Sequence, residues 1–260
     1  MLKFLFLIFA ISNPIFAQKI EVSALKSSVF KADIFIGIDD YQNLYYTNGS
    51  TLVKSNATKT IEFSDIQLGE ITTVDIINPL SITLFYKNFN TVVILDNTLN
   101  EITRIDFNRL DNYRNISFAR TARDRKLWIF NQDQQRIELF NYRNNTIEVT
   151  SPSIENKAIA MTSNFNFCWL ATTENLLKFN SYGNLITKQK IDLFDAIIEQ
   201  NGSIIAKSKN SLFLQRKDQT EFIPLTIKAI DIKQFYWTGE IIYIYQNDIL
   251  STYKIKTPKI

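Results

Sequence analysis

Residues 71–107, ITTVDIINPLSITLFYKNFNTVVILDNTLNEITRIDF, contain the pattern that decides the fold. The stretch holds short apolar runs at Thr72–Ile77, Ile82–Tyr86, Thr91–Leu95 and Ile102–Phe107, separated by Asn, Asp or Pro. Short apolar runs that end at turn-forming residues are typical of strands in an antiparallel meander. The stretch therefore predicts a series of strands joined by tight turns.

The same rhythm recurs along the rest of the chain. Runs such as Val92–Leu95 and Ile241–Tyr245 are apolar on both faces, which favours sheets packed between neighbouring sheets. We predict an all-β fold, a β-propeller of six four-stranded blades, with five or seven blades or another all-β architecture as alternatives. Strands that follow a polar turn recur at spacings of roughly 35 to 48 residues, in the range of propeller blades, and start near Leu44, Val92, Ile137, Leu177, Leu212 and Ile249.

The N-terminus has the features of an export signal. Lys3 precedes an apolar segment, residues 4–11, that is too short to span a bilayer, and a small residue follows at Ala17. We predict a signal peptide over residues 1–17 and a single propeller domain over residues 18–260. The strand Gln18–Leu25 stands outside the repeats, so we expect it to close the last blade.

Composition narrows the range of functions. The 260 residues are 45% hydrophobic with a net charge of +3, which excludes a disordered chain and gives no argument for nucleic-acid binding. The chain has no histidine, so the commonest general base and the commonest zinc or copper ligand are absent. Cys168 is the single cysteine and is predicted to be a buried thiol. We expect no catalytic residues, no cofactor and no metal.

Two residue sets keep other functions open. Carboxylate pairs at Asp39–Asp40, Asp65 with Glu70, and Asp106 with Asp111 could serve a hydrolase or lyase, although each lies beside a turn, where Asp commonly bonds the backbone. A glycan-binding propeller would need aromatic side chains that stack on sugars. The candidates for that role are Tyr41, Tyr45, Tyr46, Tyr142 and Tyr182.

The arginines are unevenly distributed. Eight of the nine fall between Arg104 and Arg143, and Arg120–Lys126 is predicted to be an exposed loop at one rim of the ring. They are either solvated loop charges, neutralised by Asp106, Asp111, Asp124 and Asp133, or a docking face on the second and third blades for an acidic partner. The candidate partner-binding residues are Arg109, Arg114, Arg120, Arg123 and Arg125.

Residues Asn78–Phe107, with the sequence NPLSITLFYKNFNTVVILDNTLNEITRIDF, resemble one blade of the small exported propellers that act as plug proteins of the type 9 secretion translocon. The resemblance implies a non-catalytic periplasmic protein, monomeric when free, at the inner face of the outer membrane. There it would cap a large outer-membrane translocon barrel that has no substrate in its pore. The similar residues are structural, so the resemblance assigns no contact residue.

Overall fold

The computed structural model describes residues 20–227 and 231–255, so the predicted signal peptide lies outside the described residues. Apart from the short 3-10 helix η1 (Lys87–Phe89), the assigned elements are all strands. No helix within these ranges has the length and apolar character needed to cross a bilayer. The strands are β1 (Ile20–Val29), β2 (Ile34–Ile38), β3 (Leu44–Asn48), β4 (Thr51–Ser55), β5 (Thr60–Ser64), β6 (Thr73–Asp75), β7 (Ile82–Tyr86), β8 (Thr91–Leu95), β9 (Glu101–Asp106), β10 (Ile116–Thr121), β11 (Lys126–Asn131), β12 (Arg136–Asn141), β13 (Thr146–Thr150), β14 (Ala158–Ser163), β15 (Phe167–Thr172), β16 (Asn175–Asn180), β17 (Leu185–Lys190), β18 (Ala196–Gln200), β19 (Ser203–Ser208), β20 (Ser211–Gln215), β21 (Ile223–Thr226), β22 (Gln234–Thr238), β23 (Ile241–Gln246) and β24 (Ile249–Ile255).

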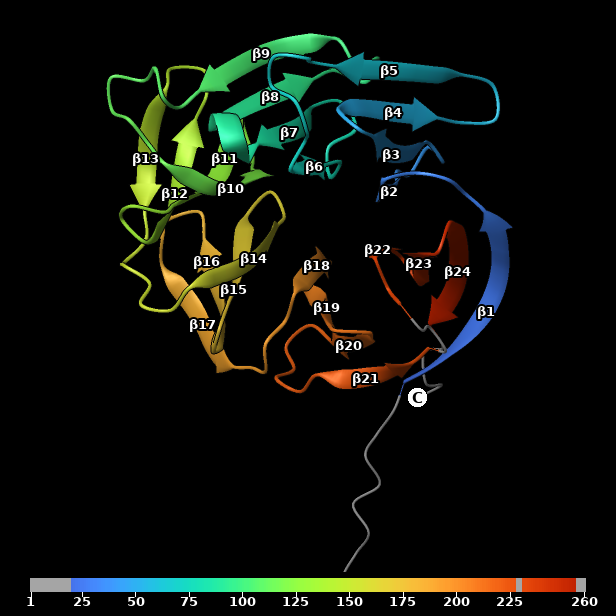
Figure 1. Ribbon diagram of the computed structural model, residues 1–260. Coiled ribbons are helices and arrows are strands. Elements are labelled where there is room, and N and C mark those ends of the chain that lie inside the picture. Colours follow the sequence, from blue (N-terminus) through green and yellow to red (C-terminus); the bar gives the residue numbers. More distant parts are fainter. Residues whose placement is uncertain (1–19, 228–230, 256–260) are drawn as a thin grey trace, which may run out of the picture.

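These strands form antiparallel meanders arranged around a central axis (Figure 1). Four sheets hold four strands each, in the orders β2-β3-β4-β5, β6-β7-β8-β9, β10-β11-β12-β13 and β14-β15-β16-β17. The first strand of each sheet is the innermost in the ring, and the fourth is the outermost. The predicted all-β fold of repeated four-stranded sheets is therefore confirmed.

The remaining eight strands form one sheet, in the order β18-β19-β20-β21-β1-β24-β23-β22. Strand β1 joins its two halves: Ile20 and Glu21 pair in parallel with β21, and the residues from Val22 to Val29 pair antiparallel with β24. The N-terminal strand thus pairs with the last strand of the chain, as expected, and runs four residues beyond the predicted end at Leu25. Because β1 merges the two halves, six separate blades are not seen as such.

The middle strands have both faces buried because each sheet packs between two others. In β7, Leu84 and Tyr86 join a core cluster with residues of the first sheet, such as Tyr45. Phe85, between them in sequence, joins the next cluster with Ile129 of the third sheet. Successive side chains of a strand point to opposite faces, so one apolar strand contributes to two cores.

Aspartate or asparagine ends or directly follows the third strand in four successive sheets. The side-chain Oδ1 of each accepts a hydrogen bond from the backbone N–H two residues later, at 2.8 to 3.0 Å, which closes the turn to the fourth strand. These equivalent residues are Asn56, Asp96, Asn141 and Asn180. In the first sheet the strand equivalent to the other predicted repeat positions is therefore β4. Leu44, the predicted position, lies in the second strand of that sheet, β3.

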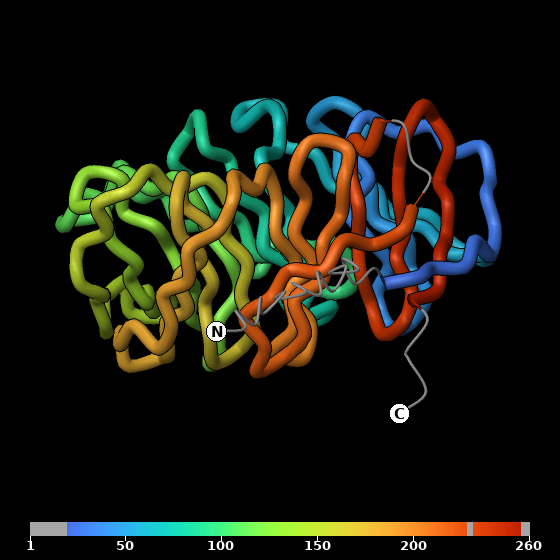
Figure 2. The backbone as a smooth tube through the Cα atoms, turned by 90° about the horizontal axis from the view of Figure 1, so that it is seen from below, coloured from blue at the N-terminus to red at the C-terminus, as the bar shows by residue number. Residues whose placement is uncertain are grey.

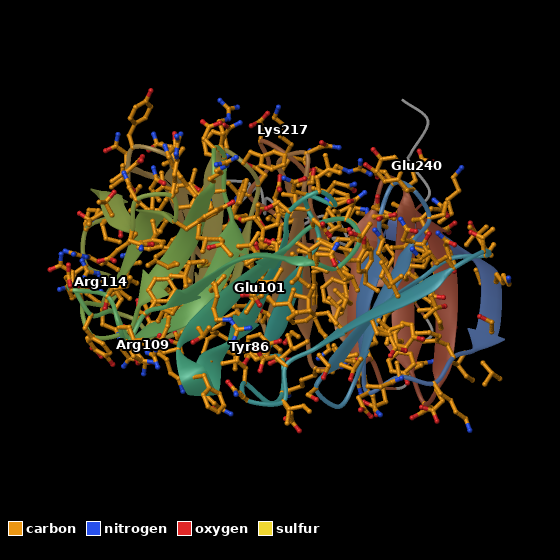
Figure 3. The ribbon with its side chains drawn as sticks, turned by 90° about the horizontal axis from the view of Figure 1, so that it is seen from above. Tyr86, Glu101, Arg109, Arg114, Lys217 and Glu240 are labelled. Carbon is orange, nitrogen blue, oxygen red and sulfur yellow. The ribbon has the colours of Figure 1, made fainter. Side chains whose placement is uncertain are left out.

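The ring has two faces, seen edge-on in Figures 2 and 3. Turns between the first and second strands, and between the third and fourth, lie on one face, which we name the Arg123 face. Turns between the second and third strands, and the connections between sheets, lie on the other, which we name the Arg109 face. Figure 3 shows Lys217 and Glu240 at the first face and Arg109 toward the second.

One sequence expectation is wrong in detail. Arg120 does not belong to an exposed loop, because β10 continues through Thr121 and places Arg120 opposite Trp128 in the sheet. The turn that follows is shorter than predicted, and Asp124 and Arg125 both have positive φ, 59° and 58°. Two consecutive left-handed residues make the tight hairpin that matches strand twist.

Candidate functional site

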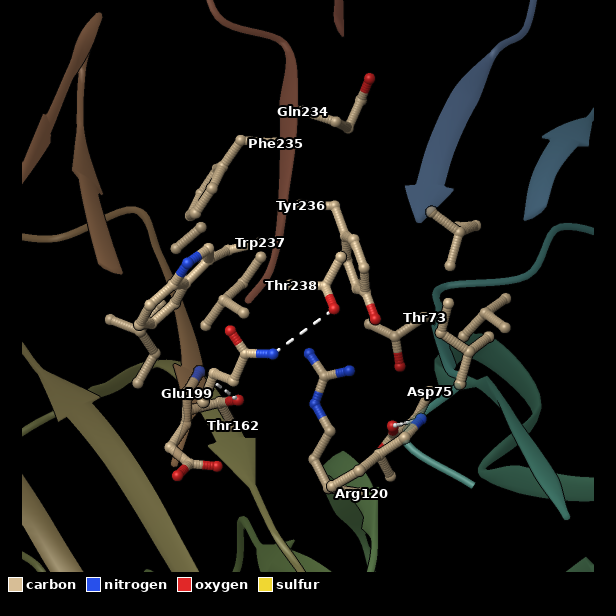
Figure 4. A pocket seen from close by; sticks show the side chains of 18 of the residues that line it. Thr73, Asp75, Arg120, Thr162, Glu199, Gln234, Phe235, Tyr236, Trp237 and Thr238 are labelled. Atoms are coloured by element: carbon tan, nitrogen blue, oxygen red, sulfur yellow. Dashed lines mark hydrogen bonds between the residues drawn. The ribbon is translucent and has the colours of Figure 1, made fainter. Parts of the chain in front are cut away.

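The first strands of the sheets surround a central cavity of about 670 Å³ (Figure 4). Strands β2, β6, β10, β14, β18 and β22 all contribute to its lining. Cavities of this size accommodate small-molecule ligands. The lining combines apolar residues, including Ile36, Val74 and Ile198, with many polar and charged residues.

Arg120 is the cation at the centre of this cavity. Its Nε donates to the carbonyl oxygen of Met161 at 2.9 Å, which links β10 to β14 and fixes the side chain. Figure 4 shows the guanidinium group directed into the cavity. Within residues 20–227 and 231–255, no ion pair joins Arg120 to a carboxylate. Its terminal nitrogens therefore remain as donors inside the cavity.

Tyr236 approaches the same space from β22. Its ring lies over Gly37, where a Cβ atom would come within 2.6 Å of Tyr236 Cδ2, so residue 37 has no room for a side chain. Burial raises the pKa of the Tyr236 hydroxyl, and the nearby carboxylates of Asp75 and Asp40 add to the effect. The hydroxyl is thus a neutral hydrogen-bonding group inside the cavity, on the side where the Arg120 guanidinium group lies (Figure 4).

The carboxylates of the lining differ in how they are satisfied. Asp75 accepts from the backbone N–H groups of Ile77 and Thr121 at 3.1 and 2.8 Å. Glu199 accepts from Gly202 N–H at 2.6 Å and from Asn164 at 3.1 Å, while burial raises its pKa. Asp40 is exposed at the Arg123 face, and its side chain makes no hydrogen bond or ion pair with the described residues.

A second hollow, of about 770 Å³, lies on the Arg123 face between the second and third sheets. Its lining includes Leu80, Ile102 and Phe165, which are 63%, 55% and 40% exposed. Arg123 and Arg125 border it, and Arg123 N–H donates to Phe165 O at 3.2 Å. Arg143 completes the set. We name this surface of apolar and guanidinium groups, Leu80, Ile102, Arg123, Arg125, Arg143 and Phe165, the Arg123 groove.

The predicted partner-binding arginines do not share one surface. Arg109 and Arg114 precede β10, whereas Arg123 and Arg125 follow it, so the two pairs lie at opposite ends of that strand. Arg109 is exposed and pairs with Asp106 at 3.2 Å. Only Arg123 and Arg125 reach the Arg123 groove, and Arg120 lines the central cavity instead.

Arg114 is committed to an internal ion pair. Its Nε lies 2.9 Å from Oε2 of Glu138, and Nε of Arg136 lies 2.9 Å from Oε1 of the same carboxylate. Asn131 Nδ2 also donates to Oε1 at 3.2 Å. Glu138 is fully buried, so this carboxylate is surrounded by its donors. Sequence analysis missed Glu138 because it lies between Ile137 and Leu139 on an otherwise apolar strand.

One member of each predicted carboxylate pair bonds the backbone of a turn. Asp39 accepts from the N–H groups of Tyr41 and Asn43, both at 2.9 Å, and from the Tyr45 hydroxyl. Asp65 and Asp106 accept from the backbone in the same way, at Gln67 and Asn108. These contacts agree with the interpretation that Asp at these positions bonds the backbone of a turn.

The predicted sugar-stacking tyrosines are only partly available. Tyr41 and Tyr182 are highly exposed. Tyr46 and Tyr142 are half-buried, and Tyr45 is fully buried.

Cys168 is buried as predicted, and burial raises the pKa of its thiol. Among the described residues, no group of three or more His, Cys, Asp or Glu side chains could hold a metal ion.

No protein-family model and no curated protein sequence matches this chain. Its structure is similar to that of a streptogramin B lyase, with a TM-score of 0.62 and 10% identity over 90% of this chain and 97% of the lyase. BamB from Moraxella catarrhalis matches with a TM-score of 0.55 and 10% identity, over 92% of this chain and 99% of BamB. PorZ, a surface component of the type-IX secretion system of Porphyromonas gingivalis, matches with a TM-score of 0.55 and 11% identity, over 89% of this chain and 34% of PorZ. At these identities the likeness establishes a propeller-type fold alone.

Proposed function

We propose that this protein is a non-enzymatic periplasmic interaction module that caps the periplasmic end of an outer-membrane secretion channel of the type 9 class. Its ring is interpreted as six modules, the last completed by β1, and it acts as a monomer when free. The observation that carries the proposal is the Arg123 groove. There, three arginines without ion pairs to the described residues border exposed apolar side chains.

The chemistry of the groove defines the partner. Guanidinium groups pair with carboxylates through two parallel hydrogen bonds, and exposed apolar side chains gain by leaving water on contact. Interfaces of this kind combine an apolar centre with a charged rim. The expected partner surface is therefore acidic with apolar centres, and it belongs to the barrel protein of the translocon. A charged rim also suits a cap that must come off, because screening by salt weakens such contacts.

Support for a non-enzymatic role comes from the residue inventory. One of the similar structures is a catalytically inactive virginiamycin B lyase in which a histidine is replaced by alanine. That lyase shares 12% identity with this chain, which contains no histidine. The catalytic group removed in that variant therefore has no counterpart here. The resemblance of Asn78–Phe107 to a blade of translocon plug proteins supports the secretion role.

Capture of the partner tests the docking surface. Tagged wild-type protein should retain a large barrel protein from detergent-solubilised envelopes. Substituting Arg123, Arg125 and Arg143 by Glu should lower the amount retained by about tenfold or more, since each change places like charges together. The control is Arg109→Glu, which reverses an exposed charge on the opposite face. Normal retention by the triple variant, or release caused by Arg109→Glu, would contradict the proposed surface.

Membrane permeability tests the capping role itself. Cells without this protein should admit large, normally excluded antibiotics through the unoccupied channel, provided that the barrel is still present. Restoring the wild-type chain should close the route, and the triple Glu variant should not. Normal permeability in cells that contain the barrel but lack this protein would remove the capping role while leaving a docking role to be judged by capture.

A further inference from the structure

The central cavity contains isolated charges of both signs, which the proposed docking function does not use. Arg120 has no ion pair with the described residues, and its guanidinium group points into the cavity. Asp40 lines the same cavity from the first sheet, is exposed, and likewise lacks a side-chain partner among the described residues. Of the other lining charges, Lys207 pairs with Asp195 at 3.5 Å, and Asp75 and Glu199 accept backbone hydrogen bonds. Lys233 is an exposed lysine of the lining whose side chain also has no partner among the described residues.

These charges discriminate between ligand classes. A cation would meet the Arg120 guanidinium, and a simple anion would meet Asp40, Asp75 and Glu199. A ligand with a carboxylate and an ammonium group in one molecule would complement Arg120 and Asp40 together. The apolar part of the lining, with Val74, Ile198 and the ring of Tyr236, suits an apolar or aromatic side chain on the same molecule.

We propose that the central cavity is a binding site for a small zwitterion of amino-acid or dipeptide size with an apolar side chain. Arg120 receives the carboxylate through its two terminal nitrogens, because Nε is held by Met161 O. Asp40 receives the ammonium group. Phe165 lines both the central cavity and the Arg123 groove, but Arg120 and Asp40 line only the cavity, so the binding test does not rely on partner capture.

The tryptophans provide a direct readout. The chain has three, and of these Trp237 lines the cavity, with its indole N–H donating to Gly239 O at 2.8 Å. All three indoles belong to core clusters, but Trp128 and Trp169 are not among the residues that line the cavity. In nitrogen-15 spectra, phenylalanine and alanylphenylalanine should each shift the Trp237 indole signal saturably at up to about 20 mM, with the other two signals unmoved. The two probes distinguish a free amino acid from a short peptide, and binding of either supports the site.

Removing a charged group from the ligand and removing its partner from the protein should weaken binding by similar factors. Phenylalaninamide lacks the carboxylate and N-acetylphenylalanine lacks the ammonium group, and each should bind about tenfold more weakly than phenylalanine. Arg120→Gln should weaken phenylalanine binding by a similar factor, and Arg143→Gln, outside the cavity, should leave it unchanged. Asp40→Asn changes an exposed side chain and should weaken binding of phenylalanine but not of N-acetylphenylalanine.

Each contrary result overturns the proposal. The zwitterion site is wrong if neither zwitterionic probe shifts Trp237, or if all three phenylalanine derivatives bind alike. It is also wrong if Arg120→Gln, shown to be folded by circular dichroism, binds as the wild type does. Should Arg120→Gln not fold, the Asp40→Asn comparison decides alone, and equal affinity for phenylalanine in that variant rejects the site.

Discussion

The two faces of the ring use the same residue type in opposite ways. On the Arg109 face, Arg109, Arg114 and Arg136 each have a carboxylate partner within this chain. On the Arg123 face, Arg123 and Arg125 have no ion pair with the described residues and border exposed apolar side chains. A dense run of arginines in sequence is therefore not one binding surface. Arg109 and Arg114, which precede β10, are paired within the chain, whereas Arg123 and Arg125, which follow it, have no ion pair with the described residues.

The largest expected effect is a loss of stability when Glu138, the carboxylate partner of Arg114 and Arg136 on the Arg109 face, is replaced. Glu138→Gln leaves Arg114 and Arg136 facing a neutral amide at a fully buried position. Breaking a buried ion pair from one side costs about 3 to 5 kcal/mol of unfolding free energy. Urea denaturation of the purified protein measures this as a lowered midpoint with an unchanged slope.

A matched control is Glu148→Gln. Glu148, on the fourth strand β13 of the same sheet, is an exposed residue whose carboxylate pairs with Lys126 of β11 at 2.6 Å. An exposed pair contributes about 1 kcal/mol or less, so the midpoint should hardly move. Equal effects of the two substitutions would mean that Glu138 does not hold the Arg109 face together.

Sequence reasoning succeeded where the determinant is local. Strands such as β7 and β8 follow from their apolar runs, and the turns from Asn and Asp that bond their own backbone. It failed where the determinant depends on sheet register or ring closure. The Arg114–Glu138 pair joins residues 24 apart in sequence, because the segment between β9 and β10 packs against β12. Tyr236 contacts Gly37 because the first and last sheets are neighbours in the ring. The exposed position expected for Arg120 depended on where β10 ends, a boundary that propensity does not fix.

A smaller, pH-dependent effect is expected at Asp65, which pairs with Arg104 at 2.7 Å. Burial alone would raise the pKa of Asp65, but hydrogen bonds from Leu68 N–H and from Arg104 together lower it below its ordinary value. A lowered folded-state pKa stabilises the protein above the unfolded value and loses that contribution as the pH falls. Asp65→Asn should therefore cost about 1 kcal/mol at pH 7, and the cost should shrink progressively as the pH falls below about 4.

Unfolding curves of wild type and Asp65→Asn between pH 7 and pH 3 measure this difference. Arg104→Gln should show a pH dependence in the same direction with a larger cost, because it removes both the pair with Asp65 and the pair with Glu101 at 2.7 Å. A cost that stays constant across the range would show that Asp65 acts through its turn alone, and it would weaken the view that carboxylates of this chain neutralise the arginines outside the Arg123 face.

The smallest effect on stability is expected at Arg125, and it separates fold from function most clearly. Arg125 has φ of +58°, where glycine is free of the strain that a side chain meets. Arg125→Gly should leave stability unchanged or raise it by about 0.5 kcal/mol, while removing a charge from the Arg123 groove and lowering partner capture. Gln135→Gly is the matched change on the Arg109 face, at φ of +49°, and should have the same effect on stability with normal capture. If both variants capture the partner equally well, Arg125 is a turn residue only, and the difference between the two faces rests on Arg123 and Arg143.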